Sequence, residues 1–362
     1  MTASAHNIHF YVGTYASEQE ESLFHCILDT TSGEMHIVSG TVGIENPSYL
    51  TVSPNRQNLY VASEKANGEL FSYSIDPENR ELHLHDRKVS EGSSPCFVET
   101  TPDGKMLLAA NYGGCVVALP IRDRGSLDQA SRVRHTGSGP NKDRQEGPHP
   151  HAFVSSPEGT FLFAPDLGTD RIAKYTLEDE LLFKQDDTEL PQGTGPRTLA
   201  FHPSGNWAYV SGELDNTVTT FEYDGQSGRL RPSQRVLLLP EPQAADPANT
   251  AAHVAVSPCG GHVYVSNRGD DSLAHFAVNP ENGQLTLVER VPSGGSVPRH
   301  FAIAGDCLLA ANQESGSIVS FTINERDGRL TPTGFALELN RPVCVCPFPE
   351  TKESESAAAE TR

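Results

Sequence analysis

The sequence predicts an all-β fold, a seven-bladed β-propeller with four-stranded blades. Three observations lead to this prediction: a motif that recurs along the chain, short runs in which apolar and polar residues alternate, and the lack of a convincing helical pattern. The motif is a proline, six residues and a second proline in a turn, followed by an apolar strand. Successive copies start 44 to 55 residues apart, which fits the roughly 40–50 residues of a four-stranded propeller blade.

Copies of the motif mark the first strand of each blade. The clear copies are PSYLTVSP from Pro47, PCFVETTP from Pro95, PHAFVSSP from Pro150 and PRTLAFHP from Pro196. The degenerate copies are AAHVAVSP from Ala251 and PRHFAIAG from Pro298, and a last copy, PVCVCPFP, starts at Pro342.

The other three strands follow in the same order in each unit. A turn such as TPDG leads to a second strand such as LYVASE, and a third alternating segment such as ELFSYSID follows. Asn or Asp with Gly then marks a hairpin to the fourth strand, as in NPENGQLTLV from Asn279.

The two ends of the chain are expected to share the seventh blade. The last copy of the motif has only a first strand, and residues 8–14, 21–29 and 33–39 match the second, third and fourth strands. Closing the ring in this way leaves no open edge. We therefore expect one propeller domain over residues 1–349, followed by a disordered tail over residues 350–362, which are polar and rich in Ala and Glu.

Composition and charge exclude several kinds of partner. The 362 residues include 27 Lys and Arg against 47 Asp and Glu, a net charge of −20. Such a balance argues against nucleic acid and anionic membranes as partners. No apolar run approaches the roughly 18 residues of a membrane-spanning helix. The oligomeric state does not follow from the sequence.

Cysteines and histidines indicate the compartment and the absence of a metal. The seven cysteines are scattered without a CxxC pair, and residues 1–7 do not resemble a signal peptide, so we expect a cytoplasmic protein. His135, His149 and His151 are close in sequence but lack the spacing of a helical metal site. We therefore expect no metal.

Two rings of equivalent positions are expected at one end of the central channel. One ring holds the residue after each leading proline, and the other holds the residue that ends each second strand, 16 positions later in the first five units. Blades one, two and seven contribute small or neutral groups plus Glu64, whereas blades three to six contribute His151, Arg197, Glu213, Arg268, Arg299 and Gln313.

Two more residues belong to this candidate site. His253 lies one place after its ring position, and strand alternation can turn it elsewhere. Arg144 lies in the long segment GSGPNKDRQEGP, which is expected to fold over the channel mouth and bring Arg144 to the site.

The convergent arginines have two interpretations. In a protein of net charge −20, three arginines at one mouth favour a binding site for an anionic molecule. Alternatively they form structural pairs between neighbouring blades, and Arg197 with Glu213 is one such possible pair.

Across almost its whole length, the chain resembles the lactonase family of seven-bladed propellers. The motifs that carry the resemblance are RQEGPHPHAF, GPRTLAFHP, the GEL around Glu213, YVSNRG and VPRHFAI, in this order and spacing. The resemblance implies opening or closing of a lactone ring without a cofactor. Matched motif by motif, it points to His151, Arg197, Glu213, Arg268 and Arg299.

The activity implied first is hydrolysis of 6-phosphogluconolactone in the pentose phosphate pathway, with a small anionic lactone as substrate. Lactone hydrolysis needs a base for water and positive groups for the oxyanion. His151 is the best candidate for the base, and Glu213 orients it or is the base itself. Arg197 and Arg268 stabilise the oxyanion or hold the substrate, and Arg299 takes the phosphate.

Three alternatives stay open. Within the enzyme class they are a muconate-type cyclase and a lactonase for unphosphorylated sugars. Outside it the alternative is a scaffold propeller without chemistry, which should expose aromatic or apolar rings on a blade face. In this sequence the aromatic residues fall at alternating core positions while charge collects at the channel, so we favour the enzyme.

Overall fold

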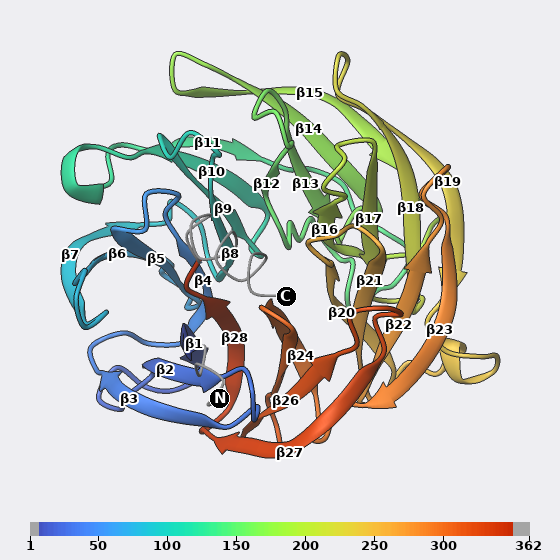
Figure 1. Cartoon of the computed structure of the whole chain (residues 1–362). Helices are drawn as coiled ribbons and strands as arrows, with labels where there is room; N and C mark the ends of the chain where they lie inside the picture. Colours follow the sequence, from blue (N-terminus) through green and yellow to red (C-terminus); the bar gives the residue numbers. More distant parts are fainter. Residues whose placement is uncertain (1–6, 350–362) are drawn as a thin grey trace.

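The computed structural model describes residues 7–349, which form seven antiparallel four-stranded sheets arranged in a ring (Figure 1). This confirms the predicted seven-bladed β-propeller. Residues 350–362, expected to be a disordered tail, lie outside the described residues.

Within blades one to six, the strands follow one another in the order of the chain. Blade one comprises β4 (Pro47–Val52), β5 (Asn58–Ser63), β6 (Glu69–Ile75) and β7 (Leu82–Val89). Blade two comprises β8 (Pro95–Thr100), β9 (Met106–Asn111), β10 (Cys115–Pro120) and β11 (Ser131–Arg134). Blade three comprises β12 (Val154–Ser155), β13 (Leu162–Asp166), β14 (Arg171–Glu178) and β15 (Leu181–Glu189).

The next three blades repeat this arrangement. Blade four comprises β16 (Pro196–Phe201), β17 (Trp207–Gly212), β18 (Thr217–Asp224) and β19 (Arg229–Leu237). Blade five comprises β20 (Thr250–Val256), β21 (His262–Arg268), β22 (Ser272–Val278) and β23 (Leu285–Pro292). Blade six comprises β24 (Pro298–Ala304), β25 (Cys307–Asn312), β26 (Ser317–Ile323) and β27 (Leu330–Glu338).

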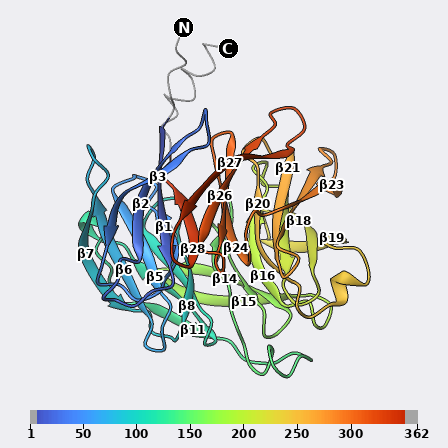
Figure 2. The same cartoon turned by 90° about the horizontal axis from the view of Figure 1, so that it is seen from below.

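Both ends of the described chain build blade seven, as predicted. Its strands are β28 (Pro342–Pro347), β1 (Asn7–Thr14), β2 (Leu23–Asp29) and β3 (Met35–Thr41). Strand β28 pairs with β1 from Phe10 opposite Pro347 to Thr14 opposite Pro342. The side view in Figure 2 shows β28 and β1 next to each other. This pairing closes the ring.

The expectation of no helix needs a small correction. Two short 3-10 helices, η1 (Asp123–Gly125) and η2 (Gln243–Ala245), lie in connections between strands. Each has only three residues, too few for an apolar periodicity to show in the sequence.

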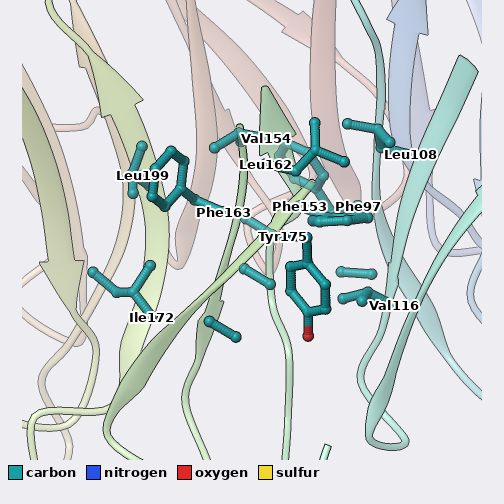
Figure 3. Close-up of a cluster of buried hydrophobic side chains, with 14 of the residues drawn as sticks. Phe97, Leu108, Val116, Phe153, Val154, Leu162, Phe163, Ile172, Tyr175 and Leu199 are labelled. Atoms are coloured by element: carbon teal, nitrogen blue, oxygen red, sulfur yellow. The ribbon is translucent and has the colours of Figure 1, made fainter. Parts of the chain in front are cut away.

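Apolar side chains fill the spaces between neighbouring blades. In the cluster drawn in Figure 3, Phe97 of blade two lies near Phe153 and Tyr175 of blade three. The rings of Phe153 and Tyr175 meet edge to face, with centroids 5.4 Å apart. Each blade packs one face against the preceding blade and the other face against the following blade. Apolar side chains on both faces of a blade are therefore buried.

Buried tyrosines also join successive blades by hydrogen bonds. The hydroxyl groups of Tyr209 and Tyr264 donate to the carbonyls of Gly283 and Gly328, at 3.0 and 2.7 Å. Tyr11 donates in the same way to the carbonyl of Arg80, at 3.0 Å. Each acceptor lies in the turn between the third and fourth strands of the following blade, so these turns occupy equivalent places.

Candidate active site

The candidate site lies where the first strands of the blades begin and the second strands end. Pairing places Pro196 opposite Gly212 in blade four and Thr250 opposite Arg268 in blade five. The two predicted rings therefore meet at the same end of the molecule, which we call the mouth.

Glu213 is the centre of the mouth on the side of blades three to five. Its Oε2 lies 3.0 Å from Nε of Arg197 and 2.9 Å from Nη2 of Arg268. Its Oε1 accepts a hydrogen bond from Nη2 of Arg144. The Glu213 side chain is only 1% exposed. One buried carboxylate thus pairs with three guanidinium groups. The arginines at the mouth therefore form both a charged cluster and structural ion pairs, the two interpretations that the sequence allowed.

The electrostatic consequence is a permanently ionised carboxylate. Burial by itself would raise the pKa of Glu213, but the charges of Arg268, Arg197 and Arg144 outweigh it and hold that pKa well below its usual range. Burial and the neighbouring Arg268 lower the pKa of Arg197 to about 10, which still leaves it charged at neutral pH. Glu213 is therefore a poor proton acceptor.

His151 lies buried beside this cluster as a neutral imidazole. Its Nδ1 is 3.7 Å from Sγ of Cys96, and its ring meets Tyr112 edge to face with centroids 5.7 Å apart. Burial, followed by the charge of Arg197, holds the pKa of His151 well below its usual value. A neutral ring keeps one nitrogen lone pair available.

Arg299 forms a second cluster with Glu64 and Tyr15. Nη2 of Arg299 lies 3.6 Å from Oε2 of Glu64, and the Tyr15 hydroxyl donates to the same oxygen at 2.7 Å. The guanidinium carbon of Arg299 lies 5.3 Å from the centroid of the Tyr15 ring. Burial lowers the pKa of Arg299, but Tyr15 and Glu64 more than reverse this effect, so the residue is held firmly charged.

A small cavity joins the two clusters. Its lining includes Cys96, His151, Arg197 and Arg299. The volume of about 10 Å³ has room for about one water molecule. The cavity can therefore hold a water next to His151 but is too small for a larger molecule.

The long segment before blade three carries Arg144 to the mouth, and its anchor is Gln145. The Gln145 side chain is fully buried, and its Nε2 donates to the carbonyl of Leu167 at 2.8 Å and to Oδ1 of Asp170 at 2.9 Å. Asp170 also accepts from the backbone of Gly195 at 2.8 Å, two residues before Arg197. The loops that bear Arg144 and Arg197 are thus tied together.

Two predicted residues are not in contact with these clusters. The ring of His253 lies against that of His300, tilted by 34° with centroids 4.1 Å apart, and His253 is absent from the lining of the cavity. Gln313 donates from Nε2 to Glu314 at 2.6 Å, and within residues 7–349 it forms no hydrogen bond to an arginine. The register of the first strand shifts by a bulge between Ala251 and Val254, so the direction of the His253 side chain does not follow from simple alternation.

Sequence reasoning missed three contributors to the mouth, namely Gln145, Tyr15 and Tyr112. Tyr15 and Tyr112 do stand at ring positions, but a neutral tyrosine gives no charge signal. Gln145 lies directly after Arg144 in the RQEG segment, and its anchoring role depends on burial that a loop sequence does not reveal.

Neither a metal-binding group nor a membrane helix is found in the described part of the chain. Among residues 7–349, no group of three or more His, Cys, Asp or Glu side chains is arranged to hold a metal ion. No helix in the same range is long and apolar enough to cross a membrane.

Comparisons with known proteins agree with this architecture. The family described as "Lactonase, 7-bladed beta-propeller" matches residues 9–347. The chain is 37% identical to the 6-phosphogluconolactonase of Bacillus subtilis over 341 residues, which cover 92% of this chain and 97% of that protein.

Solved structures extend the likeness to three dimensions. A putative 6-phosphogluconolactonase from Bacteroides fragilis superposes with a TM-score of 0.88 at 31% identity, covering 96% of this chain and 99% of that one. The periplasmic gluconolactonase of Pseudomonas aeruginosa superposes with a TM-score of 0.87 at 31% identity, covering 94% and 99%. The chain belongs to the lactonase family of seven-bladed β-propellers, and it is a lactonase.

Proposed function

We propose that this lactonase hydrolyses 6-phosphogluconolactone to 6-phosphogluconate. The observation that carries the proposal is the charge at the mouth, where, among the described residues, the guanidinium groups of Arg144, Arg197, Arg268 and Arg299 pair with just two carboxylates, Glu64 and Glu213. In a chain of net charge −20, such a local excess of positive charge suits an anionic substrate. The name of the Bacillus subtilis relative supports the same substrate.

In the proposed reaction, His151 takes a proton from water as the water oxygen attacks the lactone carbonyl carbon. The carbonyl electron pair moves to oxygen, and Arg197 and Arg268 stabilise the resulting oxyanion. The pair then returns, the bond from the carbonyl carbon to the ring oxygen breaks, and the imidazolium gives its proton to the leaving alkoxide. The products are a carboxylic acid, which ionises in water, and a free hydroxyl group.

The remaining charged residues position the substrate in this scheme. Glu213 holds Arg197, Arg268 and Arg144 in place, and it is not the base because both of its oxygens are already taken by these guanidinium groups. Arg299 binds the phosphate, since Arg299 lies in a cluster separate from that of Glu213. The small cavity lined by His151 lies between the two clusters. No metal or cofactor takes part in the scheme, and we expect full activity after exhaustive chelation.

Steady-state kinetics on two lactones tests the substrate. We expect the wild type to hydrolyse 6-phosphogluconolactone much faster than gluconolactone at equal low concentration. Arg299→Ala should reduce kcat/KM for the phosphorylated lactone by roughly 10- to 150-fold, the equivalent of one charge-assisted hydrogen bond, and leave gluconolactone unaffected. His151→Ala should lower kcat on both lactones.

Equal efficiency on the two lactones in the wild type would refute the phosphate assignment. Lactonase activity would then stand with gluconolactone as substrate, an alternative favoured by the likeness to the Pseudomonas aeruginosa gluconolactonase. Turnover is corrected for spontaneous hydrolysis, and thermal denaturation of each variant checks that it is folded.

We also propose that the reaction takes place in the cytoplasm, within the pentose phosphate pathway. All seven cysteines are unpaired, which suits a reducing compartment. The periplasmic location named for the Pseudomonas aeruginosa protein is the alternative. Fractionation of cells that produce the native chain distinguishes the two.

A further inference from the structure

A groove between blades one and two lies at the end of the strands away from the mouth. It has a volume of about 560 Å³, within the usual range for small-molecule sites. The side chains that define it are Asn55, Arg56, Arg80, His85, Arg124 and Phe348. No Asp or Glu is among the residues of its lining, although acidic residues outnumber basic ones in the whole chain by 47 to 27.

The three arginines of the groove have no carboxylate partner among the described residues. Neighbouring basic residues behave differently, because Arg87 pairs with Glu69 and Arg122 pairs with both Asp128 and Glu180. Arg56 and Arg80 instead lie against the ring of Phe348, at 5.9 and 4.5 Å from its centroid. Within the described protein, the charge of Arg80 is partly offset by the carbonyl of Pro77, which accepts from its Nη1, and by the nearby carboxylate of Asp76, while no ion pair neutralises Arg56 or Arg124.

Arg56 stands where other blades use glycine. The turn between the first and second strands contains a left-handed residue whose amide donates to the carbonyl three residues earlier. In blades two to five that residue is Gly104, Gly159, Gly205 or Gly260, with φ from 69° to 76°. In blade one it is Arg56, with φ of 60° and the same hydrogen bond to Ser53.

Arg80 repeats this exception in the turn between the third and fourth strands. The equivalent residues in blades four, five, six and seven are Gly228, Gly283, Gly328 and Gly33, with φ from 67° to 82°. Arg80 has φ of 63°, and its carbonyl accepts from Tyr11 as those of Gly283 and Gly328 accept from their tyrosines. The backbone position is thus the same in each blade.

Blade one therefore carries an arginine at both of its left-handed turn positions. A side chain in this conformation costs free energy that glycine avoids, so the turns themselves do not favour arginine. Arg124 adds a third left-handed arginine, with φ of 58°. Its carbonyl accepts from Nδ2 of buried Asn58 at 2.9 Å, which fixes this segment of blade two beside blade one.

We propose that this groove is a second anion site, which binds a small molecule carrying a phosphate group. A phosphate monoester carries close to two negative charges at neutral pH and three acceptor oxygens, which suits several converging guanidinium groups better than a single carboxylate does. The groove lies at the opposite ends of the strands from the mouth, so its ligand does not take part in lactone hydrolysis directly. The proposal stands independently of the substrate assigned to the mouth.

The test uses the glycine found in the other blades as the replacement. Inorganic phosphate is titrated calorimetrically into the full chain, the double variant Arg56→Gly with Arg80→Gly, and the control Arg326→Gly, which alters an exposed arginine of blade six. We expect the double variant to bind phosphate about tenfold more weakly or worse, and the control to bind as the wild type does. The thermal midpoint of the double variant should not fall, because glycine suits both turns.

Two further titrations distinguish binding at this groove from binding at the mouth, and a preference for phosphate from a preference for carboxylate. Arg299→Ala should keep the phosphate binding that the double variant loses, and acetate at equal ionic strength should bind more weakly than phosphate. The proposal is overturned if the wild type does not bind phosphate, if the double variant binds it as well as the wild type, or if acetate binds as well as phosphate. Loss of all binding in Arg299→Ala would place the phosphate at the mouth and would also overturn it.

Discussion

Glu213 and Glu64 end equivalent second strands on blades four and one, yet their surroundings differ sharply. Glu213 is 1% exposed and touches three arginines, whereas Glu64 is 21% exposed and shares one arginine with a tyrosine. The comparison shows that the same position in a repeat serves two purposes. The fully enclosed carboxylate pairs with three cations, while the partly open one pairs with a single arginine at a longer distance.

Removing the two charges gives the largest expected contrast. Glu213→Gln leaves three guanidinium groups without a counter-charge in a buried site, and it should lower the free energy of unfolding by about 3–5 kcal/mol. Glu64→Gln keeps an acceptor for Tyr15 and loses one looser ion pair, so it should cost less than about 1 kcal/mol. Urea denaturation measures both, and equal losses would contradict the distinction.

Acid should weaken the molecule through its buried histidines before Glu213 is protonated. Burial lowers the pKa values of His151, His253 and His300, that of His253 to about 3, so these rings stay neutral in the fold but take up protons near pH 6.5 when unfolded. The unfolded chain therefore binds more protons, and stability decreases as the pH falls below about 6.5.

The free energy of unfolding falls by at most about 1.4 kcal/mol per histidine for each pH unit. Glu99 acts in the opposite direction, because burial raises its pKa to about 8, but it is one group against several. Denaturation midpoints at pH 7.0 and 5.5 measure the slope. His253→Phe should flatten it, and a stability that rises on acidification would refute the explanation.

Arg144 provides the smallest and most selective change. Its side chain is 38% exposed, so Arg144→Ala should reduce stability by no more than about 1 kcal/mol. It should raise KM for the phosphorylated lactone several-fold with little change in kcat, since the loop residue holds substrate instead of handling protons. Arg144→Lys should recover part of the loss, and a fall in kcat alone would contradict this role.

The ring of blades and many of the residues at the mouth could be predicted from the sequence, for a physical reason. Each blade repeats the same strands and turns, so residues such as Arg197 and Arg268 can be aligned by position, and the structure brings both to Glu213. Arg144 could also be assigned to the mouth from the sequence, because its long loop leads directly to His151, which lies at the mouth.

Other features depend on details that alignment by position does not carry. Bulges at the start of the first strands change which way the next side chain faces, so the position of His253 in the repeat does not determine its direction. The tie from Gln145 to Asp170 is a contact between loops without a periodic pattern. The groove of blade one became visible only when left-handed turn residues were compared between blades.

The shared seventh blade has a consequence for folding during synthesis on the ribosome. Strand β1 emerges from the ribosome before its partner β28, which is made more than three hundred residues later. At about 5–20 residues per second, that interval is on the order of tens of seconds. During this time one edge of β1 lacks its neighbour and stays open to pairing with other strands until β28 has been made.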